Sequence, residues 1–229
     1  MKTVAIVLAA GSGTRMGTSV KKQYIDLNGH ELIWYSLRAF QVSSADEIVL
    51  VCSAEDMEHN QKYVVEFSKL TTVVSGGRER YNSVRMGLRA AGRCDKVLIH
   101  DGARPFVTPA IIDDCIGMLD SEDACVAAVP SKDTVKIVGS DGYVESTPDR
   151  RSVWLMQTPQ CFRYVVVASA YERLAELEER NELGDLHVTD DAMVVEHFGN
   201  ARVKMILADY DNIKITTPDD LSYAEWKMK

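Results

Sequence analysis

Glycines and basic residues stand together near the start of the chain, in a pattern that suits phosphate binding. The segment "VLAAGSGTRMG" (7–17) joins an apolar run to three glycines and Arg15, with Lys21 and Lys22 close behind. Glycines let backbone N–H groups approach a phosphate closely, and the cations match its charge. The segment lacks the third spaced glycine of the dinucleotide-binding fingerprint and the lysine of a P-loop. We therefore expect a nucleotide polyphosphate bound in another way, with a tight turn carrying surface bases as the alternative.

Charged residues also follow later apolar runs. "HDGARPF" (100–106) ends such a run with Asp101, which could hold Mg²⁺ between phosphates or simply cap a turn. Lys214 lies inside the apolar pattern "NIKITT" (212–217), where a cation needs an anionic partner. "GGRERYNS" (76–83) adds Arg78, Arg80 and Ser83. Together these segments predict one binding site whose rim carries several cations and an acid.

The elements that must position this rim alternate along the chain between apolar, β-branched runs and amphipathic stretches. We expect strands at 3–10, 46–53, 71–77, 96–102, 123–130, 202–207 and 212–217. We expect helices at 31–40, 55–69, 80–91, 109–120 and 163–180, and helices starting at Thr189 and at Thr217. Short continuous apolar strands between helices indicate a sheet covered on both faces. The fold class is therefore α/β, a doubly wound and mostly parallel sheet, whose ligands bind at the carboxyl edge.

Residues 133–148 break this rhythm, because two short strands flank a glycine-containing turn. We interpret them as a β-hairpin arm, approximately 131–155, inserted into one domain of residues 1–229. A two-stranded hairpin is marginal in water unless it packs against something. A homodimer through the arm is therefore expected.

The composition excludes several classes of protein. A formal net charge of −8 argues against nucleic acid as a partner. We expect no membrane span, because no apolar run approaches the roughly 18 residues required. The five cysteines show no CxxC pairing, which suits a reducing cytoplasm, and the weak basic start disfavours a signal peptide.

Six motifs, taken in order, carry a resemblance that covers essentially the whole chain. They are "LAAGSGTRMG", "KKQY", "HDGARP", "QTPQCF", "TDDA" and "NIKITTPDDL". This set resembles the 2-C-methyl-D-erythritol 4-phosphate cytidylyltransferases, enzymes of the non-mevalonate isoprenoid route with a Rossmann-like nucleotidyltransferase fold. The resemblance implies transfer of CMP from CTP to methylerythritol phosphate, with Mg²⁺ and release of pyrophosphate. The alternatives are a ribitol 5-phosphate cytidylyltransferase and a non-catalytic nucleotide-binding protein.

The resemblance also implies a role for individual residues. The implied CTP-binding residues are Ala9, Ala10, Gly11, Ser12, Gly13, Gly77, Arg78, Ser83, Gly102 and Arg104. The implied catalytic residues are Arg15, Lys22, Lys214 and Arg150. The implied residues for methylerythritol phosphate are Asp101, Thr134, Arg150, Thr158, Thr189 and Lys214, with Asp101 also the Mg²⁺ ligand. In this family the arm crosses to the other subunit, so Thr134 and Arg150 would serve the neighbour's site.

Two positions depart from the family pattern, and two adjacent lysines leave a choice open. Arg78 stands where an acidic residue is common, and Gly102 where many relatives have alanine. Lys21 and Lys22 both precede Gln23 closely, and we favour Lys22, the one directly before it.

Overall fold

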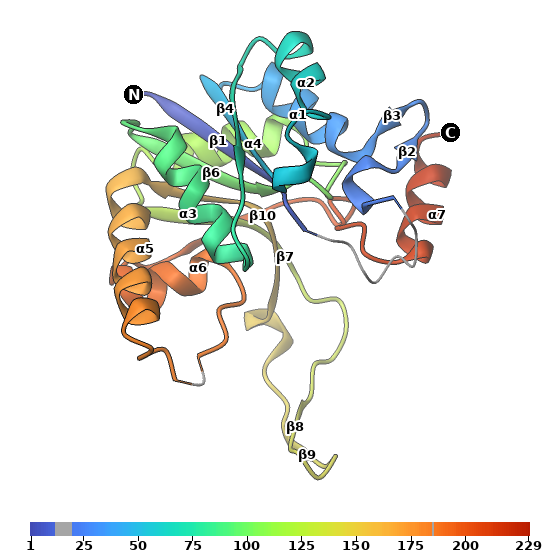
Figure 1. Cartoon of the computed structure of the whole chain (residues 1–229). Helices are drawn as coiled ribbons and strands as arrows, with labels where there is room; N and C mark the ends of the chain where they lie inside the picture. Colours follow the sequence, from blue (N-terminus) through green and yellow to red (C-terminus); the bar gives the residue numbers. More distant parts are fainter. Residues whose placement is uncertain (12–19, 185) are drawn as a thin grey trace.

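A seven-stranded sheet forms the centre of the computed structural model, which describes residues 1–11, 20–184 and 186–229 (Figure 1). The strand order is β11-β7-β10-β6-β1-β4-β5, and every neighbouring pair is parallel except the two pairs made by β10. The strands are β1 (Thr3–Ala9), β4 (Glu47–Cys52), β5 (Leu70–Ser75), β6 (Lys96–Asp101), β7 (Ala124–Pro130), β10 (Trp154–Arg163) and β11 (Lys204–Leu207). The prediction of a doubly wound, mostly parallel α/β sheet is confirmed.

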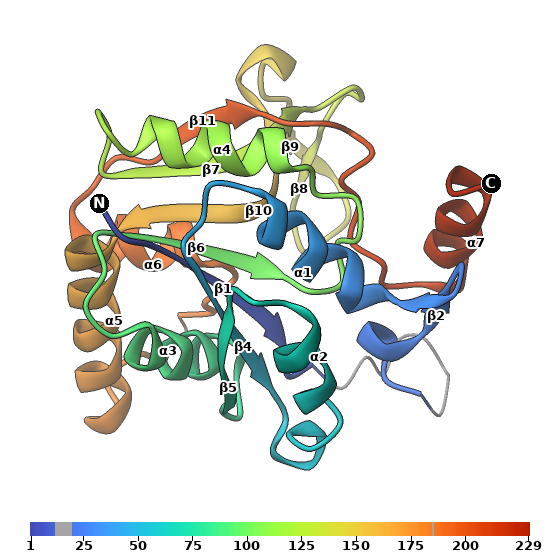
Figure 2. The ribbon, with the colours of Figure 1, turned by 90° about the horizontal axis from the view of Figure 1, so that it is seen from above.

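Helices cover both faces of the sheet (Figure 2). One face carries α1 (Leu32–Val42), α2 (Gln61–Glu66) and α4 (Pro109–Met118), and the other carries α3 (Arg80–Ala91), α5 (Tyr164–Glu179) and α6 (Asp191–Val194). The last helix, α7 (Pro218–Lys227), packs with the small hairpin of β2 (Asp26–Leu27) and β3 (His30–Glu31). No helix among the described residues is long and apolar enough to cross a membrane.

Two apolar cores hold these layers together. Because successive side chains of a strand point to opposite faces, β1 contributes Ala5 and Val7 to one core and Val4 and Ile6 to the other. All four side chains are fully buried. This double burial explains why β1 reads as a continuous apolar run, and it fixes the end of β1 in the middle of the sheet.

Strand β10 was not predicted from the sequence. Its "QTPQ" segment (157–160) is polar and contains a proline, which is unusual in a central strand. The β10–β7 ladder shifts register between Met156 and Gln160, so the proline lies where the regular ladder is interrupted. The amide of Gln157 donates to the Asp209 carbonyl (2.9 Å), so the polar side chain is satisfied by the loop that follows β11.

Three other boundaries differ from the predictions. The helix expected at 55–69 is a 3-10 turn, Ala54–Asp56, followed by the short α2. The helix expected from Thr189 begins at Asp191, because the Asp190 carboxylate accepts the Met193 N–H (2.9 Å) and caps it. The strand expected at 212–217 is absent, because these residues join no sheet, although the Ile215 N–H donates to the Ala103 carbonyl (2.8 Å).

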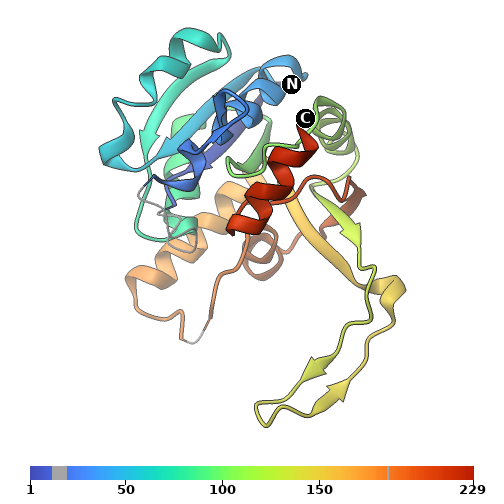
Figure 3. The same ribbon diagram turned by 90° about the vertical axis from the view of Figure 1, so that its right-hand side faces the viewer.

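The arm stands away from the body of the protein (Figure 3). Its two strands, β8 (Ile137–Val138) and β9 (Val144–Ser146), are antiparallel, so the predicted hairpin is present. Apolar side chains on it are exposed in this chain, including those of Ile137, Val138, Tyr143 and Val144.

Candidate active site

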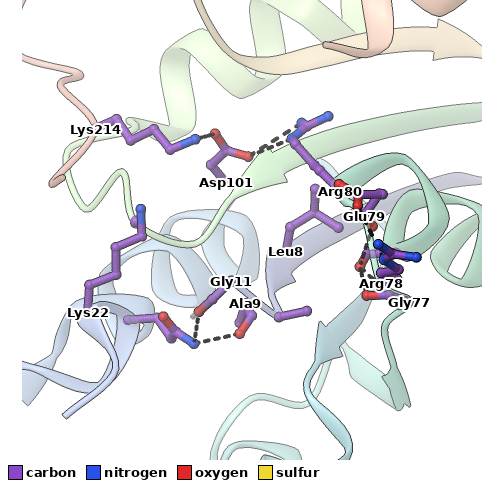
Figure 4. Close-up of a pocket in the computed structure, with 14 residues that line it drawn as sticks. Leu8, Ala9, Gly11, Lys22, Gly77, Arg78, Glu79, Arg80, Asp101 and Lys214 are labelled. Carbon is purple, nitrogen blue, oxygen red and sulfur yellow. Dashed lines mark hydrogen bonds and ion pairs between the residues drawn. The ribbon is translucent and has the colours of Figure 1, made fainter. Parts of the chain in front are cut away.

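A pocket of about 190 Å³ lies where the chain changes direction across the sheet, at the carboxyl ends of β1 and β6 (Figure 4). From β1 the chain proceeds outward to β4 and β5, and then returns to β6 on the other side of β1. Ligands of doubly wound folds bind at such switch points. The lining residues are Leu8, Ala9, Ala10, Gly11, Lys22, Gln23, Gly77, Arg78, Glu79, Arg80, Ser83, Asp101, Ala103 and Lys214.

Backbone segments approach each other closely on one side of the pocket. A Cβ atom on Gly76 would lie 2.7 Å from the Ser83 Oγ and 2.8 Å from the Ala10 Cβ. A Cβ atom on Gly77 would lie 2.4 Å from the Cβ of Asn82. Gly76 therefore lets the segment after β5 pack against the one after β1, and Gly77 lets it pack against the first turn of α3. The Gly77 N–H donates to the Ser83 hydroxyl (3.1 Å).

Gln23 holds the segment after β1 from the opposite side. Its buried side-chain amide donates to the carbonyls of Ala9 (2.7 Å) and Gly11 (3.2 Å). Because these carbonyls are tied down, the backbone at the mouth of the pocket is fixed in place before any ligand binds.

Asp101 is the buried carboxylate of the pocket, and two cations contact it. Lys214 Nζ lies 2.6 Å from Oδ2, and the Nη2 of Arg80 lies 3.4 Å from Oδ1. Burial alone would raise the pKa of this carboxyl group, but Arg80 and Lys214 outweigh burial and hold the pKa well below its ordinary value. Asp101 is therefore an anion at any working pH, and the Lys214 cation within the apolar pattern has its expected anionic partner.

The two adjacent lysines have different surroundings. Lys21 Nζ forms ion pairs with Asp56 (2.8 Å) and Glu55 and contacts the Ser53 hydroxyl (2.8 Å), so it belongs to the region after β4. Lys22 lines the pocket, and its side chain lies on the same side as Lys214 (Figure 4). Of the two lysines, Lys22 is the one that lines the pocket, and its role there stays a prediction.

Thr158 is buried behind the pocket and is not among the residues that line it. Its hydroxyl oxygen accepts the Asp101 N–H (3.1 Å) and lies 2.9 Å from Nδ1 of His100. Burial lowers the pKa of His100 to about 3, so the ring is neutral. In this structure Thr158 positions the Asp101 backbone, in addition to the substrate role implied by the resemblance.

Only some of the remaining residues implied for CTP binding line the pocket. Ser83, Gly77 and Arg78 line the pocket, and the Arg78 side chain is 92% exposed. Gly102 and Arg104 do not line it, although Ala103 between them does. The Arg104 guanidinium donates to the Asn212 carbonyl (2.7 Å) and joins the end of β6 to the segment that carries Lys214.

Other implied residues lie outside the pocket or outside the described residues. Thr134 and Arg150 are exposed at the base of the arm, where Arg150 donates to the Lys132 carbonyl (3.1 Å). Thr189 is exposed just before α6. Ser12, Gly13 and Arg15 fall within 12–19, beyond the residues that the structure describes.

Several residues that organise this site are not predicted from the sequence. They are Arg80, Gln23, Gln160 and Asp191. The available signals were the arginine at the first position of α3 and the polar pairs of "QTPQ" and "TDDA". Their partners lie far away in the sequence, so the pattern alone does not pair them.

Comparison with known proteins shows the family of this chain. A family model described as 2-C-methyl-D-erythritol 4-phosphate cytidylyltransferase matches residues 3–229. A protein of that name from Lachnospira eligens is 47% identical over 223 residues, which is 96% of each chain. One from Geobacter metallireducens is 45% identical over 237 residues, covering 100% of this chain and 98% of the relative.

Solved structures agree as well. The crystal structure of 4-diphosphocytidyl-2C-methyl-D-erythritol synthase from Anaerococcus prevotii superposes with a TM-score of 0.86 at 34% identity, covering 99% of this chain and 96% of that one. The Thermus thermophilus 2-C-methyl-D-erythritol 4-phosphate cytidylyltransferase gives a TM-score of 0.76 at 26% identity, covering 99% and 98%. With this fold, this pocket and a family match over nearly the whole chain, the protein belongs to the 2-C-methyl-D-erythritol 4-phosphate cytidylyltransferase family.

Proposed function

We propose that the protein transfers CMP from CTP to the phosphate of 2-C-methyl-D-erythritol 4-phosphate and releases pyrophosphate. The observation that carries the proposal is the meeting of Lys22, Lys214 and Asp101 in one pocket, beside the backbone that follows β1. A protein that only binds a nucleotide does not need this set of opposed charges. The family match supplies the substrate class.

The chemistry needs charge neutralisation more than proton transfer. The attacking group is a phosphate monoester with a second pKa of about 6, so it is largely a dianion at pH 7. No general base is required, and the neutral, buried His100 does not serve as one. The barrier comes from repulsion between this dianion and the triphosphate, which fixed cations can lower.

Lys22 and Lys214 supply those cations. Both line the pocket, so a triphosphate bound along the backbone after β1 would face both of them. We assign Lys22 to the triphosphate and Lys214 to the space between the attacking phosphate and the α-phosphate. Arg15 is also assigned to the triphosphate, on sequence grounds alone.

The residues present are compatible with Mg²⁺ as the metal. Mg²⁺ is commonly held by one or two carboxylates together with substrate phosphates. Asp101 provides one ionised carboxylate at the pocket, and among the described residues no group of three or more acidic or histidine side chains gathers there. We propose that Asp101 holds Mg²⁺ only when phosphate oxygens complete its shell. The metal would then neutralise charge on the phosphates.

The second substrate is proposed to bind across a homodimer. Thr134 and Arg150 lie on the arm and not in the pocket of their own chain, while apolar side chains of the arm are exposed. A twofold partner would cover those apolar side chains and bring Thr134 and Arg150 to the partner's pocket. Cytoplasm is the proposed compartment, because all five cysteines are free thiols.

A pyrophosphate-release assay tests the function. Purified protein is mixed with CTP and Mg²⁺, and either methylerythritol phosphate or ribitol 5-phosphate is added. We expect turnover with the first substrate and little with the second. Preference for ribitol 5-phosphate would reassign the substrate, and CTP binding without turnover on either would favour a non-catalytic nucleotide-binding protein.

A further inference from the structure

Asp191, the first residue of α6, is a carboxylate with no exposed surface. Such a group is stable only when it is paired and hydrogen-bonded. The Tyr171 hydroxyl donates to its Oδ1 (2.5 Å), and its own N–H donates to Oε1 of Gln160 (3.0 Å). These contacts fix Asp191 between α5 and β10, directly behind the pocket.

The charged partner of Asp191 is Arg80. Nη1 and Nη2 of the guanidinium lie 2.9 and 2.8 Å from the two carboxylate oxygens, an arrangement with two parallel hydrogen bonds. The same guanidinium reaches Asp101 only through two longer contacts of 3.4 Å. Bidentate pairs of this kind are the stronger form of ion pair. Arg80 is thus held mainly by Asp191 and only secondarily by Asp101.

The pairing of Arg80 with Asp191 affects the charges around Asp101. Asp101 faces two cations, Arg80 and Lys214, and a metal ion must compete with both for its oxygens (Figure 4). The Asp191 carboxylate matches the charge of Arg80 and holds the guanidinium in place through its two hydrogen bonds. Without that charge, Asp101 would be the nearest carboxylate left for Arg80.

We propose that Asp191 is a positioning residue that restrains Arg80, so that Asp101 stays available to the divalent cation carried by the nucleotide. The proposal rests on the proposed function of Asp101 as the Mg²⁺ ligand. Asp191 itself touches neither substrate nor metal and acts only through Arg80. Tyr171 and Gln160 in turn hold Asp191 in register with the guanidinium.

The test replaces Asp191 with asparagine, which keeps the shape and an acceptor for Tyr171 but removes the charge. We expect the Mg²⁺ concentration for half-maximal turnover to rise about tenfold, while kcat at saturating Mg²⁺ stays near that of the unaltered protein. A second readout does not depend on turnover. Calorimetry measures CTP affinity over a series of Mg²⁺ concentrations with no second substrate, and the same shift is expected there.

The matched control is Asp190→Asn, the same chemical change one residue earlier. Asp190 caps α6 through the Met193 N–H and accepts a hydrogen bond from Gln160 (3.0 Å). In the described part of the chain, Arg80 pairs with Asp101 and Asp191 and not with Asp190. Asparagine is also a good N-cap. We expect an unchanged Mg²⁺ series for this variant.

The double variant Arg80→Gln/Asp191→Asn covers the case in which Asp191→Asn alone does not fold. Removing both charged partners of a buried pair is milder than removing one. With Arg80 gone, nothing from α3 competes for Asp101, so we expect a Mg²⁺ requirement at or below that of the unaltered protein. A requirement raised tenfold in the double variant would overturn the proposal.

Asp101→Asn separates this proposal from the proposed function. If Asp101→Asn changes the Mg²⁺ dependence of CTP affinity and a folded Asp191→Asn does not, the role of Asp191 is wrong and Asp101 remains the metal ligand. If neither variant changes it, the assignment of Asp101 itself fails, and the role of Asp191 fails with it.

Discussion

Lys214 Nζ lies 2.6 Å from Oδ2 of Asp101, so the segment after β11 is joined by an ion pair to the end of β6. Both residues line the pocket. Burying either charge alone would cost free energy, and the ion pair offsets that cost for both residues. In the proposed function, Asp101 would give up part of this contact to hold the metal ion, and Lys214 would then be available to the phosphates.

Asp101→Asn is the direct test of that exchange. The substitution keeps the shape of the side chain but removes the anion, so we expect a much higher Mg²⁺ requirement with the fold intact. Pyrophosphate release over a Mg²⁺ series gives the requirement, and circular dichroism checks the fold. An unchanged series would show that Asp101 only positions Lys214 and Arg80.

Lys22→Ala and Lys21→Ala form a matched pair. Lys22 lines the pocket, whereas Lys21 is paired with Asp56 and Glu55. We expect Lys22→Ala to lower kcat by ~10²-fold or more, the scale seen when one donor that stabilises the transition state is removed. Lys21→Ala should leave kcat within a few-fold of the unaltered protein.

The steady-state parameters decide the role of Lys22. A raised KM with a normal kcat would mean that Lys22 binds substrate without stabilising the transition state. Arg15→Ala is expected to behave like Lys22→Ala, on the basis of its place in the glycine-rich segment.

The sequence predicts those features whose signals come from residues close together in the chain. The run from Val4 to Val7 predicts a strand buried on both faces, and Thr108 beside Pro109 predicts the start of α4, where the Thr108 hydroxyl accepts the Ile111 N–H (3.3 Å). Both signals lie within a few neighbouring residues. They do not depend on what the rest of the chain does.

Strand β10 and the Arg80–Asp191 pair could not be predicted in this way. The polar side chains of β10 mark it as a loop until the segments that satisfy them are known, such as the Asn212 amide that donates to Gln157 (2.9 Å). Likewise, Arg80 lies on α3 and Asp191 on α6, and only the packing of both helices on one face of the sheet brings them together. The tertiary structure decides which residues that are distant in the sequence contact each other.

His100 predicts a dependence of stability on pH. Its folded-state pKa of about 3 lies below the value of about 6.5 for an unfolded histidine. Between these values the unfolded chain binds the extra proton, so the stability that His100 contributes is present above pH 6.5 and is lost as the pH falls toward 3. The slope is up to about 1.4 kcal/mol per pH unit.

Urea unfolding at a series of pH values measures this slope. His100→Asn keeps a polar atom near the Thr158 hydroxyl but removes the titrating ring, so its free energy of unfolding should fall less steeply between pH 6.5 and 4. His187 is exposed, and His187→Asn serves as the control with the slope of the unaltered protein. Equal slopes in all three proteins would show that the His100 ring can be protonated in the folded state.

The arm and the proposed homodimer can be tested together by mixing two inactive proteins. If Arg150 reaches the partner's pocket, each active site combines Lys22 of one chain with Arg150 of the other. The homodimers of Lys22→Ala and of Arg150→Ala should then both lose most of their turnover. When the two are unfolded, mixed in equal amounts and refolded, random pairing makes half of the dimers heterodimers.

In each heterodimer one site carries both substitutions and the other carries neither. Turnover should therefore recover to roughly a quarter of that of the unaltered protein, because half of the dimers contain one intact site of two. Native mass spectrometry measures the heterodimer fraction, which separates failure to mix from failure to recover. If heterodimers form and turnover stays at the level of the two parents, Arg150 serves the site of its own chain. The exposed apolar side chains of the arm, such as Tyr143, would then need another explanation.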